Sequence, residues 1–306
     1  MIGNGPLLIC DGACGTNLQE REVSESAWDG KEGCNEYLNL SIPELIVEMH
    51  RSFVAAGSQA VETNTFGASR IVLAEYGLEN AVDVINQAAV ANARAAIGSK
   101  SSCAILGSVG PGTKLPSLGH ITVDELAAAA YEQARALVEA GVDALLIETC
   151  QDLLQVKTVL VTCIEVLEEQ GADLPVLVSV TLERQGTMLV GSDIAAVAAT
   201  LEPYPIFSLG LNCATGPADM SSHIRYLSHQ WPGRISCMPN QGLPEVIAGK
   251  TVYPLSPEEY ATHMKRFIVE DGVSIVGGCC GTTPEHIHTL TQALVGVTSA
   301  ERQVEA

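Results

Sequence analysis

Short β-branched stretches alternate with long amphipathic stretches along almost the whole chain, and this alternation restricts the folds open to it. Eight stretches are expected to be strands: 7–10, 59–62, 103–109, 144–148, 176–181, 206–211, 234–238 and 273–276. Helical patterns follow near 41–56, 81–97, 122–140, 151–169, 192–200, 218–229, 256–270 and 284–295. Alternating strands and helices form parallel βα units, and eight units predict a (β/α)8 TIM-type barrel of the α/β class.

A doubly wound open sheet is the alternative arrangement of such units. The first strand is not followed by Gly-x-Gly-x-x-Gly, the phosphate-binding sequence typical of that fold. No Ser/Pro-rich linker or charge run divides the 306 residues, so we expect one domain over 1–306 with its core at about 7–295. Residues 11–40 would form a long first βα connection, and 299–306 a frayed polar tail.

Composition narrows the classes of function. The formal net charge of −20 argues against nucleic-acid binding, which needs clustered Lys and Arg, and favours docking of a basic partner. No apolar run reaches the roughly 18 residues of a membrane helix, and the start of the chain lacks a signal-peptide pattern. We therefore expect a cytoplasmic protein without membrane contact. Its ten cysteines are then metal ligands or small core residues.

Three cysteines stand at the ends of predicted strands. Cys213 ends Phe207-Ser-Leu-Gly-Leu-Asn-Cys213, while Cys279 and Cys280 lie in Val276-Gly-Gly-Cys-Cys-Gly-Thr-Thr-Pro284. Only one strand separates strands six and eight of a barrel, so their carboxyl ends can share a metal. Three thiolates with an open fourth position are typical of catalytic zinc. Another thiophilic ion, or three small core cysteines, is the alternative.

Two carboxylates also follow predicted strands, Asp11 after the first and Glu148 after the fourth. They either cap and form ion pairs within loops, or bind a substrate ammonium at the barrel mouth. The turn Asp11-Gly-Ala-Cys-Gly-Thr16 offers backbone N–H groups that suit a carboxylate. Beside an open zinc, these features predict a site for an amino acid that carries a thiol.

These motifs resemble a known family. The segments are Asp11-Gly-Ala-Cys-Gly-Thr16, Glu62-Thr-Asn-Thr-Phe-Gly-Ala68, Glu148-Thr149, Gly210-Leu-Asn-Cys213 and Gly277-Gly-Cys-Cys-Gly-Thr-Thr-Pro284. They are similar to the zinc-dependent homocysteine S-methyltransferase family, and most of all to the homocysteine-binding module of cobalamin-dependent methionine synthase. The resemblance covers residues 7 to about 295.

The resemblance implies a (β/α)8 barrel that binds one zinc ion through Cys213, Cys279 and Cys280. It implies that Asp11 and Glu148 bind the amino group of homocysteine, and that no catalytic side chain acts beyond the zinc site. The remaining residues expected around the substrate are Ala13, Cys14, Gly15, Thr16, Thr63, Asn64 and Asn212.

The sequence indicates less about the methyl donor than about the metal and the thiol substrate. The betaine-using branch of the family has a tyrosine where this chain has Gly67, so we expect a wider mouth that fits methylcobalamin on another protein. The chain lacks the Asp-x-His-x-x-Gly cobalamin motif. We therefore expect methyl transfer to homocysteine, giving methionine, with methylcobalamin supplied by a separate corrinoid protein and not bound by this chain alone.

Three alternatives remain open. The first is a self-sufficient enzyme that uses S-methylmethionine or betaine, and the second is an enzyme with a different thiol acceptor. The third is a non-catalytic partner subunit that binds zinc or a thiol. The sequence fits a stand-alone subunit and a module of a longer protein equally well.

Overall fold

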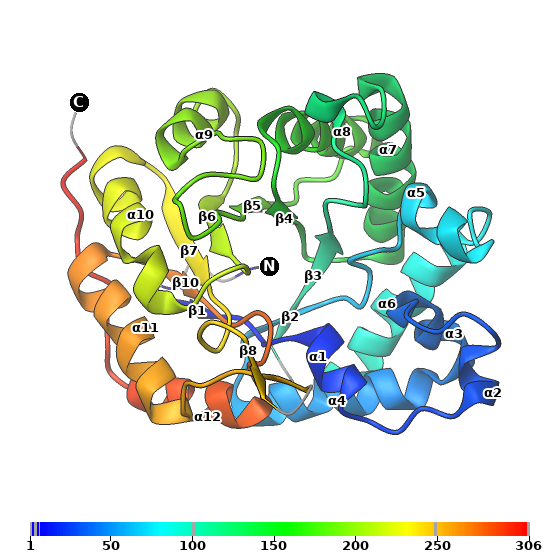
Figure 1. The fold of residues 1–306 in the computed structure, drawn as a ribbon, viewed down its shortest axis with the longest axis horizontal. Helices are drawn as coiled ribbons and strands as arrows, with labels where there is room; N and C mark the ends of the chain where they lie inside the picture. The colour runs from blue at the N-terminus through cyan, green and yellow to red at the C-terminus, as the bar shows by residue number, and fades with distance from the viewer. Residues whose placement is uncertain (1, 3–4, 6, 100–101, 248–249, 305–306) are drawn as a thin grey trace.

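The computed structural model describes residues 2, 5, 7–99, 102–247 and 250–304. Eight parallel strands form one sheet in the order β1-β10-β7-β6-β5-β4-β3-β2, curled into a barrel with helices around it (Figure 1). The strands are β1 (Leu8–Ile9), β2 (Ala60–Glu62), β3 (Ala104–Val109), β4 (Ala144–Cys150), β5 (Val176–Val180), β6 (Ser208–Asn212), β7 (Arg234–Met238) and β10 (Ile275–Val276). The predicted single (β/α)8 barrel is confirmed.

The barrel is nearly closed where its edge strands β1 and β2 meet. The N–H of Gln59 donates to the carbonyl of Ile9 at 2.7 Å, and the N–H of Ile9 donates to Gln59 Oε1 at 2.9 Å. Beyond them, the N–H of Glu62 donates to both carboxylate oxygens of Asp11, at 3.2 and 3.1 Å. The Asp11 side chain therefore completes the hydrogen bonding between β1 and β2 at the mouth of the barrel, and we call this junction of the two edge strands the seam.

One long helix follows each barrel strand. These helices are α4 (Pro43–Ala56), α6 (Val82–Ile97), α7 (Val123–Ala140), α8 (Leu153–Gln170), α9 (Ile194–Leu201), α10 (Pro217–Gln230), α11 (Pro257–Asp271) and α12 (Pro284–Ala293). Capping boxes of Thr122 with Glu125 and of Ser256 with Glu259 begin α7 and α11. Within the described residues, no helix is long and apolar enough to cross a membrane.

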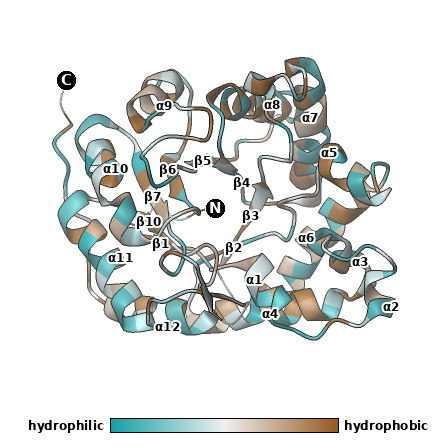
Figure 2. Cartoon of the chain, in the orientation of Figure 1, coloured by the Kyte–Doolittle hydropathy of each residue, from teal (hydrophilic) through white to brown (hydrophobic). Residues whose placement is uncertain are grey.

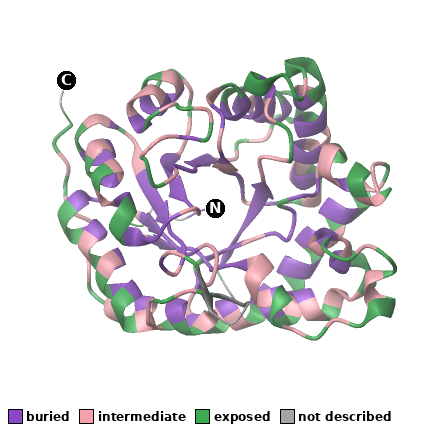
Figure 3. Ribbon diagram, viewed as in Figure 1, coloured by how far each residue is buried: buried purple, intermediate pink, exposed green. Residues whose placement is uncertain are grey.

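The strands and helices differ in the residues that they expose. Figure 3 shows strands that are largely buried and helices with exposed residues on their outer sides. Figure 2 shows hydrophilic and hydrophobic residues interspersed along the same helices. This amphipathic pattern is the one from which the helices were predicted.

Side chains that point into the barrel change character along the strands. One apolar cluster inside it contains Leu8, Ala60, Leu106, Leu146, Leu177 and Ile275. Because alternate residues of a strand share a face, the next inward positions toward the carboxyl ends are polar. They are Glu62, Ser108, Glu148, Ser179 and Asn212. The apolar layer therefore forms a floor, and polar side chains stand above it.

Short elements were not predicted individually. The first connection contains α1 (Cys14–Gln19), α2 (Glu25–Trp28), a 3-10 helix η1 (Asn35–Tyr37) and α3 (Leu38–Ser41). Later connections contain α5 (Arg70–Leu73), η2 (Ala74–Tyr76), η3 (Pro116–Leu118) and an antiparallel hairpin of β8 (Glu245–Ile247) and β9 (Lys250–Val252). Most of these helices are about one turn long, which is too short for a 3.6-residue repeat to appear in the sequence.

The expectation of a frayed C-terminal tail is wrong as far as Arg302. The N–H of Ala300 donates to the carbonyl of Ile268 at 3.0 Å. The Arg302 guanidinium donates to the carbonyl of Trp231 at 2.7 Å, and also to that of Gly233. Since the last carbonyls of a helix have no partner within it, this guanidinium stabilises the C-terminal end of α10.

Candidate active site

A cavity of about 210 Å³ opens at the carboxyl ends of the barrel strands. It is lined by Gly12, Ala13, Cys14, Gly15, Thr16, Asn35, Glu36, Glu62, Thr63, Asn64, Phe66, Ser108, Glu148, Thr149, Asn212, Cys213, Met238, Gly278, Cys279 and Cys280. Every residue predicted to bind metal or substrate is in this set except Asp11. No Lys, Arg or His of the described residues lines the cavity, so its carboxyl groups have no cationic partner there.

The three predicted metal ligands come together on one side of this cavity. The sulfur atoms of Cys213, Cys279 and Cys280 all lie within 4.8 Å of one another, and those of Cys213 and Cys280 are 3.9 Å apart. Cys213 follows β6, while Cys279 and Cys280 follow β10, and β7 lies between these strands. The topology therefore brings together cysteines that are 67 residues apart in the chain.

Main-chain contacts hold these cysteines in place. Cys213 has a φ of +61°, a left-handed conformation that costs a residue with a Cβ about 1–3 kcal/mol and is frequent at functional sites. The segment after β7 supports the other two, because the N–H of Cys279 donates to the Pro239 carbonyl at 2.9 Å and that of Cys280 to Asn240 Oδ1 at 3.0 Å. Hydrogen bonds donated by the N–H groups of Cys279 and Cys280 thus fix the loop, and the three cysteines line the cavity.

The geometry and the chemistry of this cluster both suit a thiophilic metal. Tetrahedral coordination with metal–sulfur distances of about 2.3 Å separates the sulfurs by about 3.8 Å, close to the 3.9 Å between Cys213 and Cys280. Hydrogen bonds with Cys213 and Cys279 lower the pKa of the Cys280 thiol to about 3. Hydrogen bonds with the other two sulfurs raise the pKa of Cys279 well above its usual range. Since the thiolate is the form that binds a metal ion, the lowered pKa of Cys280 favours metal binding by this cluster.

Glu148 lies near the end of β4 and lines the same cavity. Its Oε1 accepts a hydrogen bond from Ser108 Oγ at 2.6 Å, and its Oε2 accepts one from Asn212 Nδ2 at 3.2 Å. Burial raises the pKa of Glu148, although these hydrogen bonds favour the charged form. A shift in the register of β4 accompanies the positive φ of Thr149, +60°, directly after it.

Asn212 links Glu148 to the thiol side of the cavity. Its Oδ1 accepts hydrogen bonds from the Thr149 N–H at 3.0 Å and from Ser179 Oγ at 2.9 Å. Its Nδ2 donates to Thr149 Oγ1 at 2.7 Å as well as to Glu148. Since Asn212 directly precedes Cys213, the amide fixes the position of the carboxylate relative to the cysteines.

Asp11 and Glu62 form a second acidic group at the seam between β1 and β2. Asp11 is 3% exposed, and both of its oxygens accept the Glu62 N–H. Burial raises the pKa of Asp11 and that of Glu62, and for Glu62 the charges of Glu148 and Asp11 add to the effect. Of these two residues, only Glu62 lines the cavity; it belongs to a recognised motif but was not singled out from the sequence.

Glu36 is a further cavity residue that the sequence did not indicate. It lies in η1, and its Oε1 accepts the N–H of Gly67 at 2.7 Å. Burial raises its pKa. Glu36 follows no barrel strand and belongs to no motif used above, so its place at the mouth depends on how the connection 11–40 folds.

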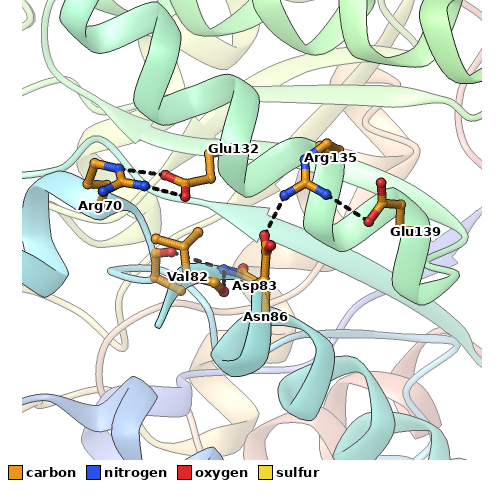
Figure 4. Close-up of polar contacts among 8 residues, drawn as sticks. Arg70, Val82, Asp83, Asn86, Glu132, Arg135 and Glu139 are labelled. Carbon is orange, nitrogen blue, oxygen red and sulfur yellow. Dashed lines mark hydrogen bonds and ion pairs between the residues drawn. The ribbon is translucent and has the colours of Figure 1, made fainter. Parts of the chain in front are cut away.

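The segment after β2 forms one wall of the cavity and is tied to the outer helices. Asn64 accepts a hydrogen bond from Cys14 Sγ at 3.3 Å, and the carbonyl of Thr65 accepts one from Gln133 of α7 at 2.8 Å. Figure 4 shows the exposed ion pairs that join the same region to α7, including Arg70 with Glu132, 2.6 Å apart. A single exposed ion pair contributes little stability. The buried hydrogen bond from the Gln133 side chain to Thr65 is therefore the main contact that holds this segment to α7.

Gly67 does not have the surroundings expected for it. It does not line the cavity, and a Cβ at this position would lie 3.0 Å from Glu36 Oε1 and 3.1 Å from Val72 Cγ1. The glycine therefore permits close packing against Glu36. Its neighbour Phe66, 43% exposed, is the aromatic residue at the cavity, and the inference of a wider mouth from Gly67 loses its support.

Comparison with known sequences fits this arrangement of thiols and carboxylates. A sequence profile described as homocysteine S-methyltransferase matches residues 8–294. The chain belongs to the homocysteine S-methyltransferase family. Methionine synthase from Mycobacterium tuberculosis is 43% identical over 302 residues, which are 97% of this chain and 25% of that protein. Methionine synthase from Mycobacterium leprae is 43% identical over 94% of this chain and 24% of its own length.

Solved structures support the fold. The homocysteine methyltransferase MmuM from Escherichia coli has a TM-score of 0.74 to this chain in both an oxidised and a metallated form, with 24% and 23% sequence identity. Each match covers 94% of this chain and 96% of the other. This chain spans about a quarter of the length of the two methionine synthases.

Proposed function

We propose that this barrel transfers a methyl group to the sulfur of homocysteine, producing methionine. The observation that carries this proposal is the cavity in which three clustered thiols face Glu148. Such a cavity can hold the thiol of an amino acid at one side and its ammonium group at the other. Membership of the homocysteine S-methyltransferase family supports homocysteine as that amino acid.

Cys213, Cys279 and Cys280 would hold one zinc ion, since soft thiolates favour this metal. Bound zinc keeps a substrate thiol deprotonated at neutral pH, and three thiolate ligands leave that sulfur electron-rich. A metallated form of MmuM is known, which supports metal binding in this family. No other side chain needs to act as a general base.

The other cavity residues bind and orient the amino acid. Glu148 and Asp11 supply the negative charge that receives the ammonium group. Ala13, Cys14, Gly15 and Thr16 line the cavity where α1 begins. The backbone N–H groups of Cys14, Gly15 and Thr16 would receive the carboxylate, while the N–H of Ala13 donates to Thr282 and holds this turn in place. The hydrogen bonds of Thr63, Asn64 and Asn212 hold the segments that line the cavity in position relative to one another.

The methyl donor in this proposal is methylcobalamin, carried by a separate corrinoid protein in the cytoplasm. Its support is the 43% identity to methionine synthases that are about four times as long as this chain. The net charge of −20 favours a partner with a basic docking surface. Methylcobalamin would supply an electrophilic methyl group to the deprotonated substrate sulfur, and the electron pair of its broken cobalt–carbon bond would stay with the corrinoid. Cys213, Cys279 and Cys280 would hold the zinc ion that keeps the substrate sulfur deprotonated.

Methionine formation by the zinc-loaded protein tests the proposal. Homocysteine is supplied with methylcobalamin, S-methylmethionine or betaine in parallel. Turnover with methylcobalamin alone is expected. Efficient turnover with a small donor would refute the corrinoid donor and leave the transferase in place, whereas homocysteine binding without turnover by any donor would indicate a non-catalytic subunit.

A further inference from the structure

The carboxyl groups of Glu36, Glu62 and Glu148 line the cavity, Asp11 lies next to Glu62, and these groups differ in their hydrogen bonds. Glu148 accepts hydrogen bonds from Ser108 and Asn212, and both oxygens of Asp11 accept the N–H of Glu62. Within the part of the chain that the structure describes, no hydrogen-bond donor or cation pairs with the Glu62 carboxyl. Glu62 therefore retains its full capacity to accept hydrogen bonds.

The position of Glu62 directs that capacity into the cavity. Ala60 belongs to the apolar cluster inside the barrel, and alternation along β2 places Glu62 on the same inward face. Glu62 lines the cavity together with Glu148, whereas Asp11 does not. Glu62 is partly buried, and its carboxyl is open to a cation that binds in the cavity.

We propose that the Glu62 carboxylate accepts a hydrogen bond from the ammonium group of the substrate and so selects amino thiols over thiols without an amino group. This inference rests on the proposed function, in which the thiol cluster receives the substrate sulfur. An ammonium group has three N–H donors, and Glu62 and Glu148 each accept one of them. Asp11 holds the backbone of Glu62 at the seam, and its charge adds to that of the two glutamates.

The proposal predicts a specific form of selectivity. A site built to hydrogen-bond a substrate N–H discriminates strongly against an analogue that lacks it, because its polar groups are then left unpaired. The matched pair of ligands is L-homocysteine and 4-mercaptobutyrate, which has the same thiol and carboxylate and no amino group. Replacing Glu62 should therefore weaken the first ligand and spare the second.

The test measures dissociation constants of both ligands by calorimetry, for the zinc-loaded wild-type protein and for E62Q. We expect E62Q to bind homocysteine about 10- to 150-fold more weakly, the range for hydrogen bonds to charged groups. Binding of 4-mercaptobutyrate and the zinc content should not change. E62D keeps the charge on a shorter side chain and should recover part of the affinity for homocysteine.

The matched control is E36Q, which alters a carboxyl of the same cavity that already accepts the N–H of Gly67. It should change the affinities for the two ligands equally or not at all. An equal loss of both ligands in E62Q, or no loss of homocysteine, would overturn the role of Glu62. If the wild-type protein binds neither ligand, the proposed function itself fails, and the two failures are thereby distinguished.

Discussion

The two sides of the cavity are built by different means. On the thiol side, Cys213, Cys279 and Cys280 are positioned by backbone conformation and by hydrogen bonds that their own N–H groups donate, including the one from Cys280 to Asn240 Oδ1. On the acidic side, Glu148 is positioned by side chains of neighbouring strands. The sulfurs of these cysteines form hydrogen bonds with one another and with Asn212, so a metal ion can replace the contacts between the sulfurs. The hydrogen bonds from Ser108 and Asn212 use part of the capacity of the Glu148 carboxylate to accept hydrogen bonds, and they favour its charged form. A carboxylate held in this way is suited to reversible binding of an ammonium group.

The difference also predicts how a substitution on each side of the cavity affects metal and substrate binding. Loss of a sulfur removes a metal ligand outright, since within the part of the chain that the structure describes these three cysteines are the one group of potential metal ligands. Loss of a carboxylate or of one of its hydrogen-bond donors reduces affinity in steps. Asn212 is the one described residue whose side chain bonds to Glu148 and whose backbone leads directly into the thiol side.

The largest expected effect is on the thiol side. C279A leaves two thiolates, too few for a stable open zinc site, so we expect less than about 0.1 equivalents of zinc after dialysis and no detectable homocysteine binding. Metal analysis and calorimetry measure both. C14S is the control, because Cys14 lines the same cavity outside the cluster. Full zinc content and activity in C279A would remove Cys279 from the ligands.

A smaller effect is expected on the acidic side. E148Q removes a negative charge and keeps the shape of the side chain, so homocysteine should bind about 10- to 150-fold more weakly with zinc content unchanged. The dissociation constant and metal content measured on the same sample separate the two sides. Unchanged affinity for homocysteine would show that Glu148 does not receive the ammonium group.

The same contrast explains what the sequence could predict. The eight strands and eight long helices lie within two residues of their predicted bounds, because both periodicities persist for several residues. The cysteines were predicted because vicinal thiols flanked by glycines are rare and follow a strand. Asp11 and Glu148 were found because each follows an apolar run directly.

Other features depend on contacts between distant parts of the chain. Glu36 reaches the mouth through η1 and meets Gly67, 31 residues away, and no local pattern marks it. Glu62 sits in a recognised motif, but only the folded barrel shows that its carboxyl has no hydrogen-bond partner among the described residues, while both oxygens of Asp11 accept a hydrogen bond. Arg302 donates a hydrogen bond to the carbonyl of Trp231, which is 71 residues away in the chain. The sequence near the C-terminus is polar and shows no pattern from which this contact could be predicted.

The pH dependence of ligand binding should report the acidic side alone when the ligand has no thiol. Methionine is such a ligand, and its ammonium group requires ionised carboxylates. Burial raises the pKa of Glu148, so the carboxyl takes up a proton as the pH falls through that raised value. Affinity for methionine should then fall by up to about tenfold per pH unit for each such group.

Calorimetry of methionine binding between about pH 5 and about pH 8, where an unperturbed carboxyl is already ionised, checks this expectation. E148Q is the internal control, since it removes one titrating group and should flatten the profile. A wild-type profile as flat as that of the variant would contradict the assignment.

The smallest effect should come from a residue that touches only the support of the acidic side. Ser108 donates to Glu148 at 2.6 Å, so S108A should weaken homocysteine binding about 2- to 13-fold, the range for one hydrogen bond. Ser236 is buried in the barrel strand β7, and its hydroxyl has no partner among the described residues. S236A therefore removes an unpaired group and should not weaken binding. Equal losses in the two variants would mean that general packing of the barrel, and not the hydrogen bond to Glu148, determines affinity on this side.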